Sequence, residues 1–176
     1  MLMKIIMFFD QIQSGFGTKD DKMVPLSGSK DLLGPSIILS PLLKEIDGKI
    51  VACIYCGNGT YLENPDEISR KICEKVDKLN PDLVICGPAF DFKDYSQMCA
   101  RICHDINTKT KVKSIAAMSK ENIDVINEYK DKILIVETPK KGGVGLNECL
   151  KNIVKVSKAV HDSENLDFVK EQFCFN

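Results

Sequence analysis

Short apolar segments alternate with amphipathic segments along this chain of 176 residues. Each apolar segment has the length of a strand and ends in glycine, proline or polar residues, whereas the segments between them repeat apolar positions three or four residues apart, as helices packed by one face do. Strands are predicted at residues 4–9, 49–56, 82–86, 111–118 and 132–137. Because no longer repeat interrupts the alternation, we expect parallel strands connected by helices.

Residues that are typical of helix ends locate the helices between these strands. Pro35 suits a first helical position, and Asn64-Pro65 combines a capping residue with a helix-compatible proline. The faces predicted to be buried are Ile37, Ile38, Leu42 and Leu43 in the first of these helices, and Ile68, Ile72, Val76 and Leu79 in the second. Further helices are predicted at residues 119–128, at residues 146–160, and after residue 90, where Tyr95, Cys99 and Cys103 share one face.

The alternation covers residues 1–160, which we expect to form one α/β domain. Its predicted architecture is a flavodoxin-like, doubly wound and mainly parallel sheet of five strands with helices on both faces. Residues 161–176 are expected to be a C-terminal tail that either packs on the domain or frays.

The charge balance excludes one class of partner. With 24 basic and 25 acidic side chains, the net charge is −1 and the pI is about 6.1, so the chain has no broad basic face for nucleic acid. The first apolar segment is too short, and too soon followed by polar residues, for a membrane span or a signal peptide. We therefore expect a cytoplasmic protein that binds neither nucleic acid nor membrane. A homo-oligomer is compatible with the sequence.

The eight cysteines are expected to be reduced, because no export signal accompanies them. Most are interpreted as core residues, since a free cysteine buries as a small hydrophobic side chain. Cys53 and Cys56 have the spacing of a redox motif, but they lie in a predicted strand, where positions three apart point to opposite faces. Cys99, Cys103 and His104 would form only an incomplete zinc ligand set, so no metal site is expected.

Ligands of such sheets bind beyond the carboxyl ends of the strands, near a switch in strand order. The loops predicted there are residues 10–19, 56–63, 87–95, 118–122 and 137–145. Cys56 directly precedes a Gly-Asn-Gly turn and is interpreted either as a site residue or as a buried thiol at a strand end. Cys99 lies early in a predicted helix, where a thiolate would be stabilised. The glycines of residues 142–145 lack a nucleotide-binding context, and Lys140-Lys141 is interpreted as solvated charge.

Several of these motifs together resemble one family. They are Asp10-Gln11 with Gly15-Phe16-Gly17, Gly34-Pro35, Cys56-Gly57-Asn58 with Tyr61 and Glu63-Asn64, Asn80-Pro81-Asp82-Leu83, Gly87-Pro88-Ala89-Phe90, Tyr95 with Cys99, Met118 with Glu121-Asn122, and Ile135-Val136-Glu137-Thr138. With this spacing, residues 4–158 resemble the N-terminal half of selenoprotein B, component B of the glycine, sarcosine and betaine reductases of anaerobic amino-acid metabolism. The chain departs from the family pattern at Asp94, Ser96 and Ala100, which leaves the substrate preference open.

The resemblance implies a substrate-binding half-subunit, an oxidoreductase component. The family places its selenocysteine in a C-terminal half, so a separate partner subunit would supply the selenol or thiol for reductive C–N cleavage, and no cofactor is expected in this chain. A small amine or amino acid is expected to contact Gln11, Gly15, Gly17, Asn58, Tyr61, Glu63, Asn64, Pro88, Phe90, Tyr95, Glu121 and Glu137, with Cys56 and Cys99 as candidate catalytic thiols. Residues 56–64 and 87–99 would be opposite walls of one pocket. The alternative is a binding or sensor domain, or another thiol-dependent enzyme, on the same scaffold.

Overall fold

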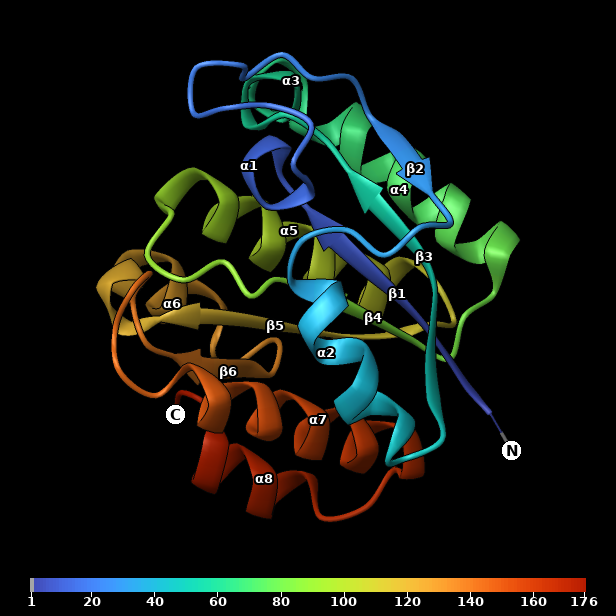
Figure 1. The fold of residues 1–176 in the computed structure, drawn as a ribbon, viewed down its shortest axis with the longest axis vertical. Helices are drawn as coiled ribbons and strands as arrows, with labels where there is room; N and C mark the ends of the chain where they lie inside the picture. Colours follow the sequence, from blue (N-terminus) through green and yellow to red (C-terminus); the bar gives the residue numbers. More distant parts are fainter. Residues whose placement is uncertain (1) are drawn as a thin grey trace.

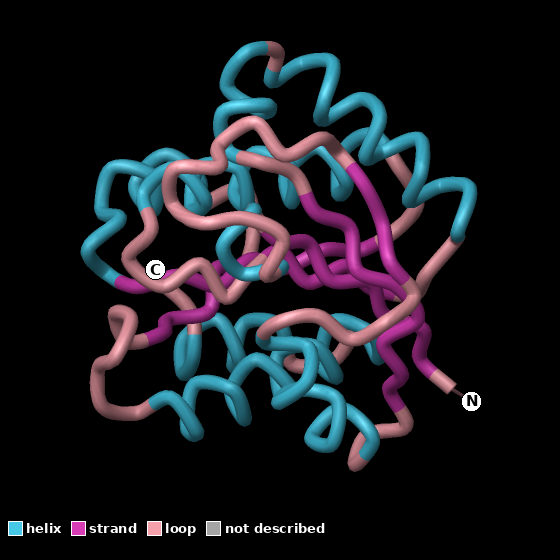
Figure 2. The backbone as a smooth tube through the Cα atoms, turned by 45° about the horizontal axis from the view of Figure 1, so that its top comes forward, coloured by secondary structure: helices cyan, strands magenta, loops and turns pink. Residues whose placement is uncertain are grey.

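A six-stranded sheet with helices on both faces makes up the protein in the computed structural model, which describes residues 2–176 (Figure 1, Figure 2). The strand order is β2-β3-β1-β4-β5-β6. The strands are β1 (Met3–Phe9), β2 (Ser27–Ser29), β3 (Gly48–Tyr55), β4 (Leu83–Cys86), β5 (Lys113–Ser119) and β6 (Ile135–Thr138).

Five of the strands are parallel, and their order is that of flavodoxin-like sheets, with β1 between β3 and β4. The prediction of five strands was one short, because β2 pairs antiparallel with the outer edge of β3. Its sequence, Ser-Gly-Ser, is too short and too polar to register as an apolar segment. β2 is held by backbone pairing rather than by burial.

The helices form two layers. They are α1 (Gln11–Ser14), α2 (Pro35–Lys44), α3 (Asn58–Glu63), α4 (Pro65–Leu79), α5 (Lys93–Lys109), α6 (Ile123–Tyr129), α7 (Leu146–Asp162) and α8 (Leu166–Phe173), with a single 3₁₀ turn at Lys120–Asn122. α2, α7 and α8 lie on one face of the sheet, and α3, α4, α5 and α6 lie on the other (Figure 1, Figure 2). None of the helices within residues 2–176 is long and apolar enough to cross a membrane.

The core lies on both faces of β1 and β4. Both strands are almost entirely buried, as central parallel strands require. α5 packs on β4 and β5 with Tyr95, Cys99 and Cys103 all fully buried, which confirms the helical face predicted from their four-residue spacing.

The face predicted for α2 was right at Leu43, which is buried, and wrong at Ile37 and Ile38. Ile37 and Ile38 are 58% and 53% exposed, and the buried side chains are Ser36, Leu39 and Leu43. Apolar residues surround most of this helix, so their spacing alone does not say which face packs against β3 and α7. Ile38 is therefore free to line the carboxyl edge of the sheet.

The C-terminal residues pack on the sheet rather than fraying. α7 extends to Asp162, and α8 packs against α7. Cys174 then pairs antiparallel with Val136 of β6, and the N–H of Phe175 donates to the carbonyl of Ile135 at 3.0 Å.

Candidate functional site

A cleft of about 350 Å³ opens beyond the carboxyl ends of β1 and β4. The chain leaves β1 toward α2 on one face of the sheet and leaves β4 toward α5 on the other, so the strand order switches between these two strands. A crevice at such a switch point is where doubly wound sheets bind ligands. The cleft is mostly apolar, with Gln13 and Lys141 as its polar side chains.

The short helix α1 forms one wall. The carboxylate of Asp10 caps α1 by accepting a hydrogen bond from the N–H of Gln13 at 2.7 Å, and Gly15 ends the helix at φ 79°. Gly34, at φ 48°, packs so closely that a Cβ there would lie 1.9 Å from the carbonyl oxygen of Gln13. Glycine at position 34 thus permits α1 and α2 to meet at the cleft.

The loop after β4 forms the opposite wall. Its backbone is fixed by hydrogen bonds from Ala89 N–H to the Ala117 carbonyl and from Ser119 N–H to the Phe90 carbonyl, each 2.9 Å long. Asn122 also donates to the Phe90 carbonyl, at 2.7 Å. The Phe90 ring is nearly buried, and the ammonium of Lys141 lies 5.4 Å from its centre. Lys141 comes from the connection between β6 and α7, and its N–H donates to the Asp91 carboxylate at 2.8 Å, so the two loops present Phe90 and Lys141 together.

Three residues predicted from the sequence, Gly15, Pro88 and Phe90, line this cleft together. The sequence interpretation missed Gln13 and took Lys141 for solvated charge. Both lie in loops that the strand pattern had already placed at this edge, so a search of those loops for polar side chains would have included them.

Gln11, Gly17 and Asn58 were also predicted to contact a substrate, but they lie in a buried layer beside the cleft. The side-chain oxygen of Gln11 accepts a hydrogen bond from Asn58 N–H, and its carbonyl accepts one from Gly17 N–H, both at 3.0 Å. One polar atom each of Asp10, Gln11 and Asn58 is buried there without a hydrogen bond. These residues join α1 to α3 and do not line the cleft.

Residues 56–64 do not form the opposite wall that the sequence predicted. Tyr61 is 3% exposed on the α5 side of the sheet, where burial raises the pKa of its hydroxyl to about 12. Asn64 caps α4 by accepting from Glu67 N–H, and Glu63 is exposed. These side chains lie away from the cleft because α3 begins directly after β3 and packs against α4 and α5.

Glu121 and Glu137 lie in a second cleft, of about 360 Å³, at the ends of β5 and β6. Lys120, Lys140 and Glu148 also line it. The acidic side chains predicted as countercharges are thus separated from the cleft at the switch point.

The burial of Cys56 and Cys99, predicted from the sequence as candidate catalytic thiols, does not favour a thiolate at either position. Neither has any exposed surface. Burial raises the pKa of Cys56 to about 12 and that of Cys99 well above its ordinary value. Cys99 lies beyond the first turn of α5, too far along for the helix terminus to stabilise a thiolate. Tyr95 beside it is also fully buried and donates to the Phe8 carbonyl at 2.6 Å.

We expect all eight cysteines to react slowly with iodoacetamide in the native protein. Every one of them is buried, so labelling requires local or global opening. At near-neutral pH the native rates should be more than about a hundredfold below those in denaturant. Mass spectrometry of peptides from a time course measures each site. Rapid labelling of Cys99 ahead of Cys73 and Cys149 would contradict this structure.

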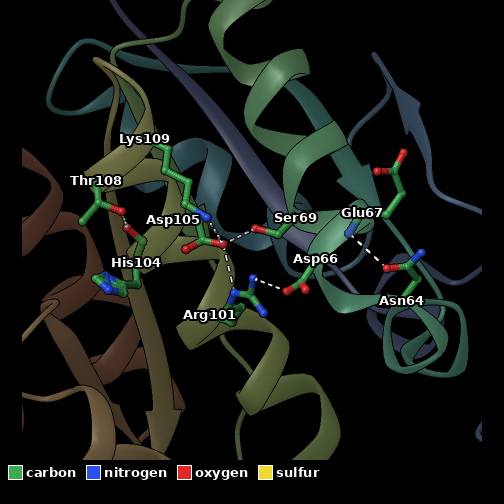
Figure 3. A network of polar contacts seen from close by, with 9 residues as sticks. All are labelled: Asn64, Asp66, Glu67, Ser69, Arg101, His104, Asp105, Thr108 and Lys109. Carbon is green, nitrogen blue, oxygen red and sulfur yellow. Dashed lines mark hydrogen bonds and ion pairs between the residues drawn. The ribbon is translucent and has the colours of Figure 1, made fainter.

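An ion-pair network joins α4 to α5 away from both clefts (Figure 3). Asp105, 5% exposed, accepts hydrogen bonds from the Ser69 hydroxyl and from Arg101, and Lys109 lies 3.4 Å away. Burial alone would raise the pKa of Asp105, but these hydrogen bonds and positive charges hold it below the ordinary value. Arg101 also binds Asp66 at 2.8 Å, so the network fixes the two helices to each other.

Asp10 gives a pH-dependent prediction for the wall of the first cleft. Burial raises its pKa above the ordinary 3.8, although N–H groups of Gln13 and Ile12 oppose the rise. The native state then holds the proton more tightly than the unfolded state, so the stability from Asp10 is present below pH 3.8 and lost as pH rises through the raised pKa.

We therefore expect Asp10→Asn, which keeps the capping oxygen, to gain stability relative to the wild type as pH rises above 3.8. Urea unfolding of both proteins from pH 3.5 to 8 measures the difference. If the difference in the free energy of unfolding between the two proteins stays constant with pH, the ionisation of Asp10 does not destabilise the native state.

Comparison with known proteins gives the family. The family model for the glycine/sarcosine/betaine reductase selenoprotein B matches residues 2–175. The chain belongs to this family. No solved structure matches it significantly.

The similar curated proteins are reductase subunits. The sarcosine reductase complex component B subunit beta of Peptoclostridium acidaminophilum is 27% identical over 136 residues, 77% of this chain and 31% of that protein. The glycine reductase complex component B subunit gamma of Symbiobacterium thermophilum is 28% identical with the same coverage. The betaine reductase complex component B subunit beta of P. acidaminophilum is 23% identical over 98% of this chain and 38% of that protein. The chain thus spans about a third of the length of these relatives.

Proposed function

We propose that this chain binds a small amino acid or ammonium compound in the cleft at the switch point and works as one part of a component B-like reductase. The observation that carries the proposal is a cleft of ligand size at the switch point of a chain that belongs to the selenoprotein B family. Its relatives are named as subunits of sarcosine, glycine and betaine reductases.

The chain's part in this proposal is to bind and orient, while a partner supplies the reducing group. Reductive cleavage of a C–N bond needs two electrons, and the amine departs with the bonding pair. The buried cysteines of this chain are poor donors for that step, because a thiol reacts as an accessible thiolate. A selenol or thiol on a separate subunit would have to reach the open mouth of the cleft.

Thermal unfolding with candidate ligands tests the proposal. At a ligand concentration one hundred times its dissociation constant, binding adds about 2.7 kcal/mol, which raises the melting temperature by roughly 5–10 °C in a chain of this size. We expect such a shift with at least one of glycine, sarcosine, betaine and proline, and we expect affinity purification from the native host to recover a second subunit. No shift with any of the four and no recovered subunit would favour a free-standing domain with another ligand.

A further inference from the structure

The cleft at the switch point carries positive and no negative charge. Lys141 is the one ionic side chain among the residues that line it, and it forms no ion pair within the described residues. Its ammonium is placed over the Phe90 ring. The second cleft is of mixed charge, because Glu121, Glu137 and Glu148 line it together with Lys120 and Lys140. The charge of the first cleft therefore favours an anionic group near Lys141.

α7 begins at the same cleft without a cap. Leu146 lines the cleft, and Gly145 before it, at φ 104°, offers no side chain to cap the helix. Within residues 2–176, the N–H groups of Leu146, Asn147 and Glu148 donate no hydrogen bond. The first turn of this 17-residue helix thus carries unpaired N–H groups and the positive end of the dipole at the border of the two clefts, with Leu146 lining the first cleft and Gly145 and Glu148 lining the second.

Gln13 supplies a second polar group to the cleft, independent of Lys141. It lines the cleft and is only 8% exposed, yet its side-chain amide forms no hydrogen bond in the described part of the chain. Its amide atoms are not sealed in the protein interior, so the group faces the cleft and is accessible to a bound molecule. Its NH₂ group is a suitable donor to a carboxylate oxygen.

We propose that this cleft holds the carboxylate of the ligand, bound by Lys141, Gln13 and the first N–H groups of α7. The inference rests on the proposed function and specifies which part of the ligand this cleft binds and through which residues. Glycine, sarcosine and betaine carry the same carboxylate and differ only in the methylation of nitrogen. A site that binds the carboxylate therefore accepts all three. Glu137, expected from the sequence to offer a countercharge, lies in the second cleft and takes no part in this contact.

Titrations of ¹⁵N-labelled protein followed by NMR test the assignment with glycine, acetate, glycinamide and inorganic phosphate. Glycine and acetate should shift the amide resonances of Leu146, Asn147 and Lys141, whereas glycinamide, which lacks the carboxylate, should leave them in place at equal concentration. Calorimetry should show that Lys141→Gln lowers the affinity for glycine at least about tenfold, the value of one charge-assisted hydrogen bond. Gln13→Met should also weaken binding.

Lys155→Gln is the matched control. Lys155 is likewise exposed over a phenylalanine ring, 5.2 Å from Phe173, but on the part of α7 that packs near α8. This variant should keep the wild-type affinity. Equal binding of glycinamide and glycine, tighter binding of phosphate than of either carboxylate, or no effect of Lys141→Gln would overturn the carboxylate assignment and leave the proposed function standing. If none of the compounds moves any resonance, the proposed function fails and the assignment fails with it.

Discussion

Replacing Gly34 by alanine is expected to lower the free energy of unfolding by roughly 2–5 kcal/mol and to disrupt the cleft. The added Cβ would lie 1.9 Å from the carbonyl oxygen of Gln13, and the backbone at φ 48° and ψ −127° is strained for any residue with a side chain. Backbone strain and overpacking each cost about 1–3 kcal/mol. Because the clash is with backbone, α1 and α2 must separate to relieve it. Chemical denaturation measures the loss of stability.

Gly15→Ala is the matched control for this variant. Gly15 lines the same cleft and also has a positive φ, 79°, but a Cβ there meets nothing within 4 Å. We expect it to cost only the left-handed backbone penalty, about 1–2 kcal/mol. If the two variants lose the same stability, the close contact between Gly34 and Gln13 is not a determinant of the fold.

Arg101→Met is expected to lower the free energy of unfolding by about 2–3 kcal/mol. The methionine keeps much of the apolar stem but leaves the Asp105 carboxylate, whose side chain is 7% exposed, without its shortest ionic contact. Breaking a buried ion pair from one side costs more than the pair contributes, because the remaining charge stays desolvated. Ser69 and Lys109 still reach Asp105, which limits the loss.

Arg70→Met serves as the comparison on α4. Arg70 makes two ion pairs, with Glu67 and Glu74, but its side chain is 58% exposed. Exposed pairs are screened by solvent and contribute little. Both variants are measured by urea unfolding at neutral pH. A loss for Arg70→Met as large as that for Arg101→Met would mean that burial of Asp105 does not set the energy of the network.

Most of the fold followed from the hydrophobic pattern. The five parallel strands and the helix with Tyr95, Cys99 and Cys103 were found because burial leaves a clear period in the sequence. β2 and α1 were missed because backbone pairing and a capping carboxylate hold them instead. The face of α2 was assigned wrongly at Ile37 and Ile38 because apolar residues surround that helix.

The candidate site could be predicted only in part. Strand ends identified the loops, and Gly15, Pro88 and Phe90 indeed line one cleft. What the sequence could not show is the direction in which each loop turns, and this direction sends Tyr61 toward α5 and Glu137 into a second cleft. The sequence could not show the burial of the cysteines either, since position near a helix start says nothing of burial, and burial sets the pKa of Cys99.

A crystal structure with glycine, sarcosine or betaine bound is the most direct test of the central claim, that the cleft at the switch point is the working site. We expect ligand density between Gln13, Phe90 and Lys141, with the carboxylate toward the start of α7. Density in the second cleft beside Glu137, or an empty first cleft at a concentration that saturates binding in solution, would contradict it.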